Sequence, residues 1–176
     1  MLLYRDGDAG AFDALYARHK GGVYRYLLRQ CRDAAAAEEL FQDVWMNLIR
    51  ARARYTVQAR FTTYLYRLAH NRLIDHYRSN SQAAMVSFEG EDREALMEIP
   101  DGRVAPADET LDARRRAVRL LELLAELPEA QREAFVLQQE GGMSVEEIAQ
   151  ATGVTRETAK SRLRYAMSRL REGMRE

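Results

Sequence analysis

The chain has 176 residues, of which 47% are hydrophobic, and it contains only three prolines and ten glycines. This composition allows one domain or two small ones and favours long helices over disorder. No apolar run approaches the roughly 20 residues needed to cross a bilayer, and the single Cys31 cannot form an internal disulfide. The first ten residues carry Arg5, Asp6 and Asp8 in place of an apolar leader, so we expect a cytoplasmic protein.

The formal net charge of zero hides three segments of different sign. Residues 1–78 hold 13 basic and 8 acidic side chains, residues 79–112 hold 2 and 9, and residues 113–176 hold 12 and 10. The segment charges are therefore +5, −7 and +2. Two basic ends joined by an acidic middle suit a protein that contacts nucleic acid in two places.

The first segment predicts three amphipathic helices, because apolar residues recur at spacings of three and four. Asp33 is placed to cap the second helix, and no strand alternation is visible. The apolar positions of the three helices are Phe12, Leu15, Tyr16, Val23 and Leu27, then Leu40, Phe41, Val44, Trp45, Leu48 and Ile49, then Phe61, Leu65, Leu68 and Leu73.

Residues 79–112 lose the helical periodicity and carry Pro100, Gly102, Pro106 and most of the acidic excess. These 34 residues are too many for an ordinary loop inside one compact domain. We therefore predict a helical domain over residues 1–78, a flexible acidic linker over 79–112, and a second helical domain over 113–176.

The second domain is punctuated by residues that begin and end helices. A leucine-rich helix leads up to Pro128, which we expect to be the first residue of the next helix. The remaining signals are a helix end at Gly141 and Gly142, a capping box of Ser144 with Glu147, a turn at Gly153, and a cap at Thr155.

Residues 144–171 form the strongest local signal, because a capped short helix, a tight turn and a basic second helix are typical of the helix-turn-helix. The second helix should enter the major groove of DNA. We expect Arg156, Glu157, Lys160 and Ser161 to face base edges, and Arg162 and Arg164 to contact phosphates. The alternative is a solvated basic helix in an ordinary bundle.

A second signal lies in residues 36–78. Glu38, Glu39 and Asp43 share the polar side of one predicted helix. Further along, aromatic and basic residues alternate: Tyr55, Phe61, Tyr64, Tyr66 and Tyr77 with Arg54, Arg60, Arg67, Arg72 and Arg78. Rings stack on unpaired bases and guanidinium groups hold the backbone, which indicates single-strand binding. The alternative, a role in the core, stays open for Tyr55.

Four stretches carry a family resemblance: AEELFQDVW at 37–45, FTTYLYRLAHNRLIDHYR at 61–78, LPEAQREAF at 127–135, and Ser161-Arg162-Leu163. The first two are similar to regions 2.2 to 2.4, and the last two to region 4, of the extracytoplasmic-function (ECF) sigma factors of the sigma-70 family. The resemblance implies an all-α protein, with a region 2 bundle and a region 4 helix-turn-helix joined by a flexible acidic linker.

The resemblance also implies roles for individual residues. Core RNA polymerase would be bound through the clamp helices of its largest subunit by Glu38, Glu39, Gln42 and Asp43, and region 4 would meet the flap of the second-largest subunit. The minus-10 element would be read by Tyr55, Arg60, Tyr64, Arg67, Asn71 and Arg78, and the minus-35 element by Arg156, Glu157, Lys160, Ser161, Arg162 and Arg164. The linker would thread the polymerase channels.

Two positions depart from the family pattern. Tyr64 stands where the family usually has tryptophan, and Tyr165 stands where a basic residue is common. The first change keeps an aromatic ring, and the second implies that one phosphate contact is missing.

The expected function is that of an alternative sigma factor directing promoter-specific initiation, with an anti-sigma factor as a further partner implied by resemblance. We expect no catalytic residue, metal, cofactor or small-molecule substrate, since His70 and His76 lie six residues apart and do not share a helical face. The alternative function is a stand-alone helix-turn-helix regulator whose N-terminal helices sense a ligand or dimerise. A redox role for Cys31 stays open.

Overall fold

The computed structural model describes residues 1–84 and 107–175, and within these ranges every regular element is a helix. The N-terminal part contains α1 (Leu2–Arg5), α2 (Ala9–Cys31), α3 (Ala34–Arg50), the short 3-10 helix η1 (Arg52–Arg54) and α4 (Phe61–Ala84). The C-terminal part contains α5 (Ala107–Glu126), α6 (Glu129–Gly141), α7 (Val145–Thr152) and α8 (Arg156–Gly173). The predicted all-α class is confirmed.

The helices begin and end where local side chains satisfy the free backbone groups of their ends. Asp33 accepts a hydrogen bond from the backbone N–H of Ala36, and Thr155 accepts one from that of Thr158. Ser144 and Glu147 form both halves of a capping box at the start of α7. These predicted caps are confirmed.

Three helix boundaries differ from the sequence prediction. Pro128 is the residue before α6, which begins at Glu129. Helix α4 continues through Ala84 and α5 begins at Ala107, so both ends of the predicted 79–112 linker are helical. Residues 85–106 of that linker, and the proposed path of the linker through polymerase, lie outside the described residues.

The N-terminal helices α2, α3 and α4 pack around a buried apolar core. Its fully buried members include Val23, Leu27, Val44, Leu48 and Leu65. At the far end of this bundle the rings of Phe12, Tyr16, Phe41 and Trp45 pack against one another, most of the pairs edge to face. Helix α4, which carries the predicted single-strand site, is anchored to this bundle by its own buried residues, such as Leu65.

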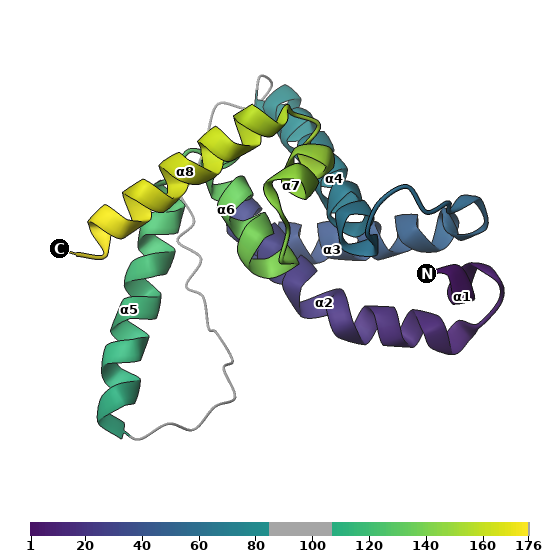
Figure 1. Ribbon diagram of the computed structural model, residues 1–176, viewed down its shortest axis with the longest axis horizontal. Coiled ribbons are helices and arrows are strands. Elements are labelled where there is room, and N and C mark those ends of the chain that lie inside the picture. Colours follow the sequence, from purple (N-terminus) through teal and green to yellow (C-terminus); the bar gives the residue numbers. More distant parts are fainter. Residues whose placement is uncertain (85–106, 176) are drawn as a thin grey trace.

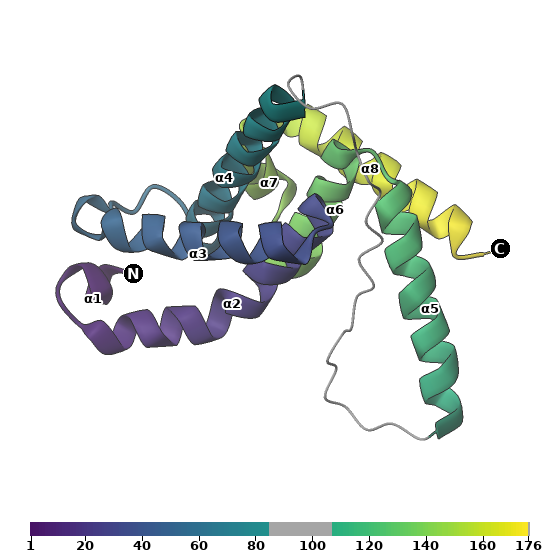
Figure 2. The same ribbon diagram turned by 180° about the vertical axis from the view of Figure 1, so that it is seen from behind.

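The C-terminal helices are built on α6, with α7 and α8 packed against it. Helix α5 lies along α8, where Leu123, Leu124 and Leu127 meet Ala166 and Leu170. Both α5 and the C-terminal half of α8 extend away from the N-terminal bundle, as seen from opposite sides in Figure 1 and Figure 2.

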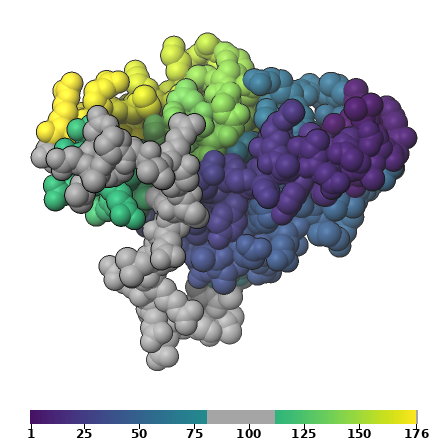
Figure 3. All heavy atoms as spheres, turned by 90° about the horizontal axis from the view of Figure 1, so that it is seen from below, coloured from purple at the N-terminus to yellow at the C-terminus, as the bar shows by residue number. Residues whose placement is uncertain are grey.

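The two predicted domains share one core. Buried residues of α6 and α7, among them Val136, Leu137 and Ile148, belong to the same cluster as Val23 and Leu65 of the N-terminal bundle. Figure 3 shows the green C-terminal helices directly against the purple and blue N-terminal ones. The C-terminal domain is therefore docked on α2 and α4.

Candidate nucleic-acid and polymerase interfaces

The end of the chain forms a helix-turn-helix. Helix α7 ends at Gly153, whose φ of 67° is in the left-handed region that glycine adopts without strain. Ile148 and Ala149 of α7 and Ala159 and Leu163 of α8 are buried, which fixes one face of α8 inward. The opposite face is left for a partner.

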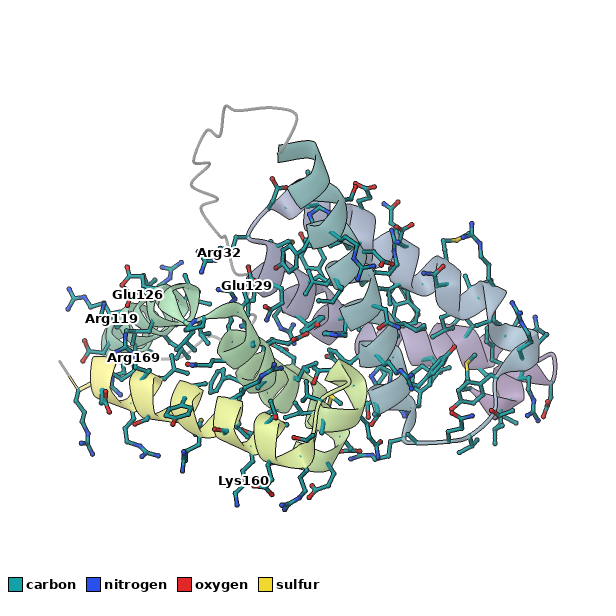
Figure 4. The ribbon with its side chains drawn as sticks, turned by 90° about the horizontal axis from the view of Figure 1, so that it is seen from above. Arg32, Arg119, Glu126, Glu129, Lys160 and Arg169 are labelled. Carbon is teal, nitrogen blue, oxygen red and sulfur yellow. The ribbon has the colours of Figure 1, made fainter. Side chains whose placement is uncertain are left out.

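The predicted minus-35 residues fall on or near that outer face of α8. Four of them are exposed and two are half-buried. The exposed ones are Arg156, Glu157, Lys160 and Arg164, and the half-buried ones are Ser161 and Arg162. Lys160 extends away from the helix (Figure 4), as a residue that reaches into a groove must do.

Arg156 is already paired in the unbound protein. Its guanidinium donates a hydrogen bond to Glu146 of α7 and lies 3.3 Å from the carboxylate of Glu157. The hydrogen bond from Arg156 holds the pKa of the Glu146 carboxyl below its usual value. Contact with DNA would therefore exchange one anionic partner of Arg156 for another.

Three of the six predicted minus-10 residues, Tyr55, Tyr64 and Arg67, line a pocket of about 500 Å³ at the start of α4, whereas Arg60, Asn71 and Arg78 do not. Tyr55 and Tyr64 line it together with Arg54, Arg67 and Thr63. Their two rings meet edge to face, with centroids 5.0 Å apart. Each phenol is neutral at pH 7 and can donate a hydrogen bond, and burial raises the pKa of both tyrosines further above the ordinary 10.

Tyr55 is buried, with only 6% of its surface exposed. Tyr55 also lines the pocket, so it belongs both to the core and to the candidate site. Arg67, Asn71 and Arg78 are exposed on α4, while Arg60 lies just before the helix and is also exposed.

Part of the alternating aromatic and arginine pattern faces inward. Tyr66 is 2% exposed and belongs to the core, and the Tyr77 hydroxyl donates a hydrogen bond of 2.8 Å to the backbone carbonyl of Gln30. Arg72 is held by Asp43 of α3. These three residues support the bundle, because α4 presents only one of its faces to solvent.

The predicted polymerase-binding residues lie on α3. Glu38, Glu39 and Gln42 are exposed, and the Gln42 amide donates a weak hydrogen bond of 3.4 Å to Glu38. Asp43 differs from the other three because it is half-buried and paired with Arg72. The exposed acidic surface of α3 is thus narrower than the sequence indicated.

One component of the pocket was missed by sequence reasoning. Gln150 of α7 lines the pocket, although it lies in the C-terminal domain. Nearby, the Glu147 carboxylate lies 3.3 Å from the Arg60 guanidinium. No local pattern signals this contact, since it joins residues 87 positions apart.

The described residues contain neither a metal site nor a membrane-spanning helix. Over 1–84 and 107–175 no group of three His, Cys, Asp or Glu side chains could hold a metal ion. In the same part of the chain no helix has the length and apolar character to cross a membrane.

A helix-turn-helix docked on a helical bundle with an aromatic and arginine-lined pocket defines a class of DNA-binding transcription proteins. Comparison with known families narrows the class. Residues 15–83 match Sigma-70 region 2, and residues 117–170 match Sigma-70, region 4. The chain belongs to the ECF sigma factors of the sigma-70 family, and its function is promoter-specific initiation of transcription.

Two relatives are similar in sequence to this chain over nearly its full length. The RNA polymerase sigma factor CarQ of Myxococcus xanthus is 33% identical, covering 98% of this chain and 94% of CarQ. The ECF RNA polymerase sigma factor RpoE of Cereibacter sphaeroides is also 33% identical, covering 95% of this chain and 88% of the relative.

Two solved structures share the fold. The sigma factor RpoE in complex with the anti-sigma factor NepR from Bartonella quintana has a TM-score of 0.76 at 20% identity, covering 94% of this chain and 97% of that one. CnrH in complex with the cytosolic domain of CnrY has a TM-score of 0.65 at 21% identity, covering 96% and 90%.

Proposed function

We propose that this sigma factor reads a promoter with two surfaces at once. The minus-35 element is bound as duplex by the outer face of α8, and the minus-10 element is bound as single strand by the pocket and exposed face of α4. The observation that carries this proposal is the pocket, because Tyr55, Tyr64, Arg54 and Arg67 combine stacking and phosphate-binding groups in one place.

Core RNA polymerase is the proposed partner that brings both surfaces to DNA. The exposed residues Glu38, Glu39 and Gln42 of α3 would dock on the clamp helices of the largest polymerase subunit, and the C-terminal domain on the flap of the second-largest. The protein acts in the cytoplasm, where promoter DNA lies, and contributes binding energy without catalytic chemistry of its own.

An anti-sigma factor is the proposed regulatory partner. In the two solved structures with the same fold, RpoE is bound to the anti-sigma factor NepR, and CnrH is bound to the cytosolic domain of CnrY. The likeness in fold supports a partner of the same kind for this chain, competing with polymerase or DNA for the same surfaces.

The first test is run-off transcription from fragmented genomic DNA of the source organism, with core RNA polymerase in the presence and absence of the protein. We expect discrete new transcripts whose start sites share upstream elements at both positions. Tight and specific DNA binding by the protein alone, without new transcripts, would instead indicate a stand-alone regulator.

A substitution on α8 tests the assignment of the minus-35 surface. Lys160→Ala should weaken promoter use by about 1–3 kcal/mol and relax preference at one position of the element if the lysine reads a base. Arg169→Ala is the matched control, since Arg169 is an exposed basic residue near the other end of α8 (Figure 4). Equal losses for both variants on every promoter would contradict base reading by Lys160.

A further inference from the structure

The short helix α1 lies beside the loop that leads into α4. Figure 2 shows it next to residues 51–60, which join α3 to α4 and contain η1. This loop supplies six of the ten residues that line the proposed minus-10 pocket, namely Ala51, Arg54, Tyr55, Thr56, Gln58 and Ala59. The shape of the pocket therefore depends on what holds the loop in place.

The loop has little regular structure of its own. Its ordered part, η1, has three residues. The N–H of Arg54 donates a hydrogen bond of 3.0 Å to the carbonyl of Ala51, and the N–H of Tyr55 donates one of 3.3 Å to that of Arg52. Hydrogen-bond geometry is poor in a 3-10 helix, and a first helical turn costs more conformational entropy than its bonds return. Contacts from outside the loop must therefore fix its position.

Two such contacts come from α1. The guanidinium of Arg52 lies over the ring of Tyr4, 4.8 Å from the ring centroid, which is a cation–π contact. The guanidinium of Arg5 donates a weak hydrogen bond of 3.4 Å to the backbone carbonyl of Tyr55. Consecutive side chains of α1 thus reach the first residue of η1 and the residue that follows η1.

Helix α1 is itself anchored to the bundle. Tyr4 is buried in the core, and its ring packs against that of Phe12 on α2, with centroids 5.2 Å apart. The turn into α2 passes through Gly7, whose φ of 114° is adopted by glycine without strain. Asp8 then caps α2 by accepting a hydrogen bond from the backbone N–H of Ala11. The turn and the cap therefore hold α1 against α2.

We propose that α1 positions the minus-10 pocket, with Tyr4 and Arg52 as positioning residues. We call this pair of residues the α1 brace. Neither residue lines the pocket, so the brace acts on DNA only through the loop, whose Tyr55 ring meets that of Tyr64 at 5.0 Å. This inference rests on the proposed function in one respect, namely that the pocket receives the minus-10 strand.

Substitutions on both sides of the contact test the brace. Arg52→Ala removes the cation from the Tyr4 ring, whereas Arg52→Lys keeps a cation on a long side chain. Tyr4→Leu removes the ring and keeps an apolar side chain in the core. Arg50→Ala is the matched control, because Arg50 is an exposed arginine in the last turn of α3, two residues before Arg52.

Each full-length variant is assembled with core RNA polymerase and assayed on a promoter found by run-off transcription. Two altered forms of that promoter carry one changed base, either in the minus-10 or in the minus-35 element. The ratio of transcript from the original and the altered promoter measures discrimination at each element. Because both transcripts come from the same preparation, partial unfolding of a variant does not change this ratio.

We expect Arg52→Ala and Tyr4→Leu to lower the minus-10 ratio about fivefold, the lower end of what one well-placed base contact contributes. The minus-35 ratio should stay unchanged. Arg52→Lys and Arg50→Ala should keep both ratios of the wild type. Hydrogen exchange of the free protein, measured by mass spectrometry, should be faster in residues 51–60 of Arg52→Ala than in those of Arg52→Lys.

A selective fall of the minus-10 ratio, restored in Arg52→Lys and accompanied by faster exchange in residues 51–60, would support the brace. An unchanged minus-10 ratio in Arg52→Ala would overturn it, as would an equal fall of both ratios. The wild-type protein tests the proposed function separately. If a changed minus-10 base leaves wild-type transcription unaffected, the proposed function fails, whereas a wild-type ratio that persists in Arg52→Ala removes only the brace.

Discussion

The two carboxylate oxygens of Glu147 have different partners. One accepts the backbone N–H of Ser144 at 2.8 Å, which completes the capping box of α7, and the other faces Arg60. Burial raises the pKa of this carboxyl, but the Ser144 N–H and Arg60 outweigh burial, so the net pKa lies below the ordinary 4.5. Local helix capping and domain docking therefore depend on the same ionised group.

The depressed pKa of Glu147 predicts a pH dependence of stability. The ionised carboxylate stabilises the folded protein above the unfolded pKa of 4.5, and this contribution is lost as the pH falls through the lower folded pKa. Urea unfolding should show Glu147→Gln to be less stable than wild type at pH 7, with the difference shrinking toward pH 4. A constant difference at all pH values would contradict the assignment. Glu122→Gln on the exposed side of α5 serves as the control.

Cys31 is held in an environment that disfavours its reactive form. It is half-buried, and its thiol donates a hydrogen bond of 3.0 Å to the carbonyl of Leu27. Burial raises the pKa of the thiol, so less thiolate is present at neutral pH. We expect its reaction with Ellman's reagent at pH 7.5 to be severalfold slower than that of glutathione. A rate equal to or faster than that of glutathione would support a redox role for Cys31.

At the scale of single elements, α3 divides its charged residues between two tasks. Glu38 and Glu39 face solvent, whereas Asp43 supports α4 through Arg72. Reversal of Asp43 would therefore disturb the bundle as well as any docked partner. The polymerase-binding assignment is better tested on the two residues that have no such structural role.

We expect the double variant Glu38→Lys, Glu39→Lys to reduce binding to core RNA polymerase by at least tenfold. Its free energy of unfolding should stay within about 0.5 kcal/mol of the wild-type value, because both side chains are exposed. Asp6→Lys with Asp13→Lys is the charge-matched control outside α3. Co-purification with core enzyme measures the effect, and unchanged recovery of the α3 variant would place the polymerase surface elsewhere.

The accuracy of the sequence prediction differed between local and non-local features. The caps at Asp33, Ser144 and Thr155 and the turn at Gly153 were predicted, because each depends on residues within four positions of one another. The exposed face of α8 was likewise predicted from the local spacing of its apolar and basic residues.

Features that depend on which helix faces meet could not be read from the sequence. Periodicity placed Tyr66 and Tyr77 among the arginines of α4, but only tertiary packing turns them inward. The pairing of Asp43 with Arg72 and the presence of Gln150 in the pocket have the same origin. The exposure of each predicted site residue therefore depends on tertiary packing, which the sequence pattern does not contain.

At the scale of the whole molecule, docking of the two domains depends on a glycine. A Cβ on Gly22 would lie 2.7 Å from the hydroxyl of Tyr66 and would also crowd the backbone of α6. At Gly21, by contrast, a Cβ would meet only the flexible end of the Arg25 side chain, at 3.1 Å. Neighbouring glycines of α2 thus separate a packing effect from a helix-propensity effect.

In the interior of a helix, alanine is more favourable than glycine by about 1 kcal/mol. Gly21→Ala should therefore stabilise the protein or leave its stability unchanged. Gly22→Ala should instead loosen the docked domains. We expect faster hydrogen exchange in α6 and α7 for Gly22→Ala only, measured by mass spectrometry. Identical protection in the two variants would show that α2 and α6 tolerate a wider separation.

The shared core also bears on how the protein unfolds. Tyr26 and Glu133 lie 107 positions apart in the sequence, and Arg25 and Glu140 lie 115 apart, yet each pair is joined by a hydrogen bond. Such distant contacts tie helices from both ends of the chain into one core. The helix-turn-helix and the pocket of α4 are therefore expected to lose their structure together, in one cooperative transition.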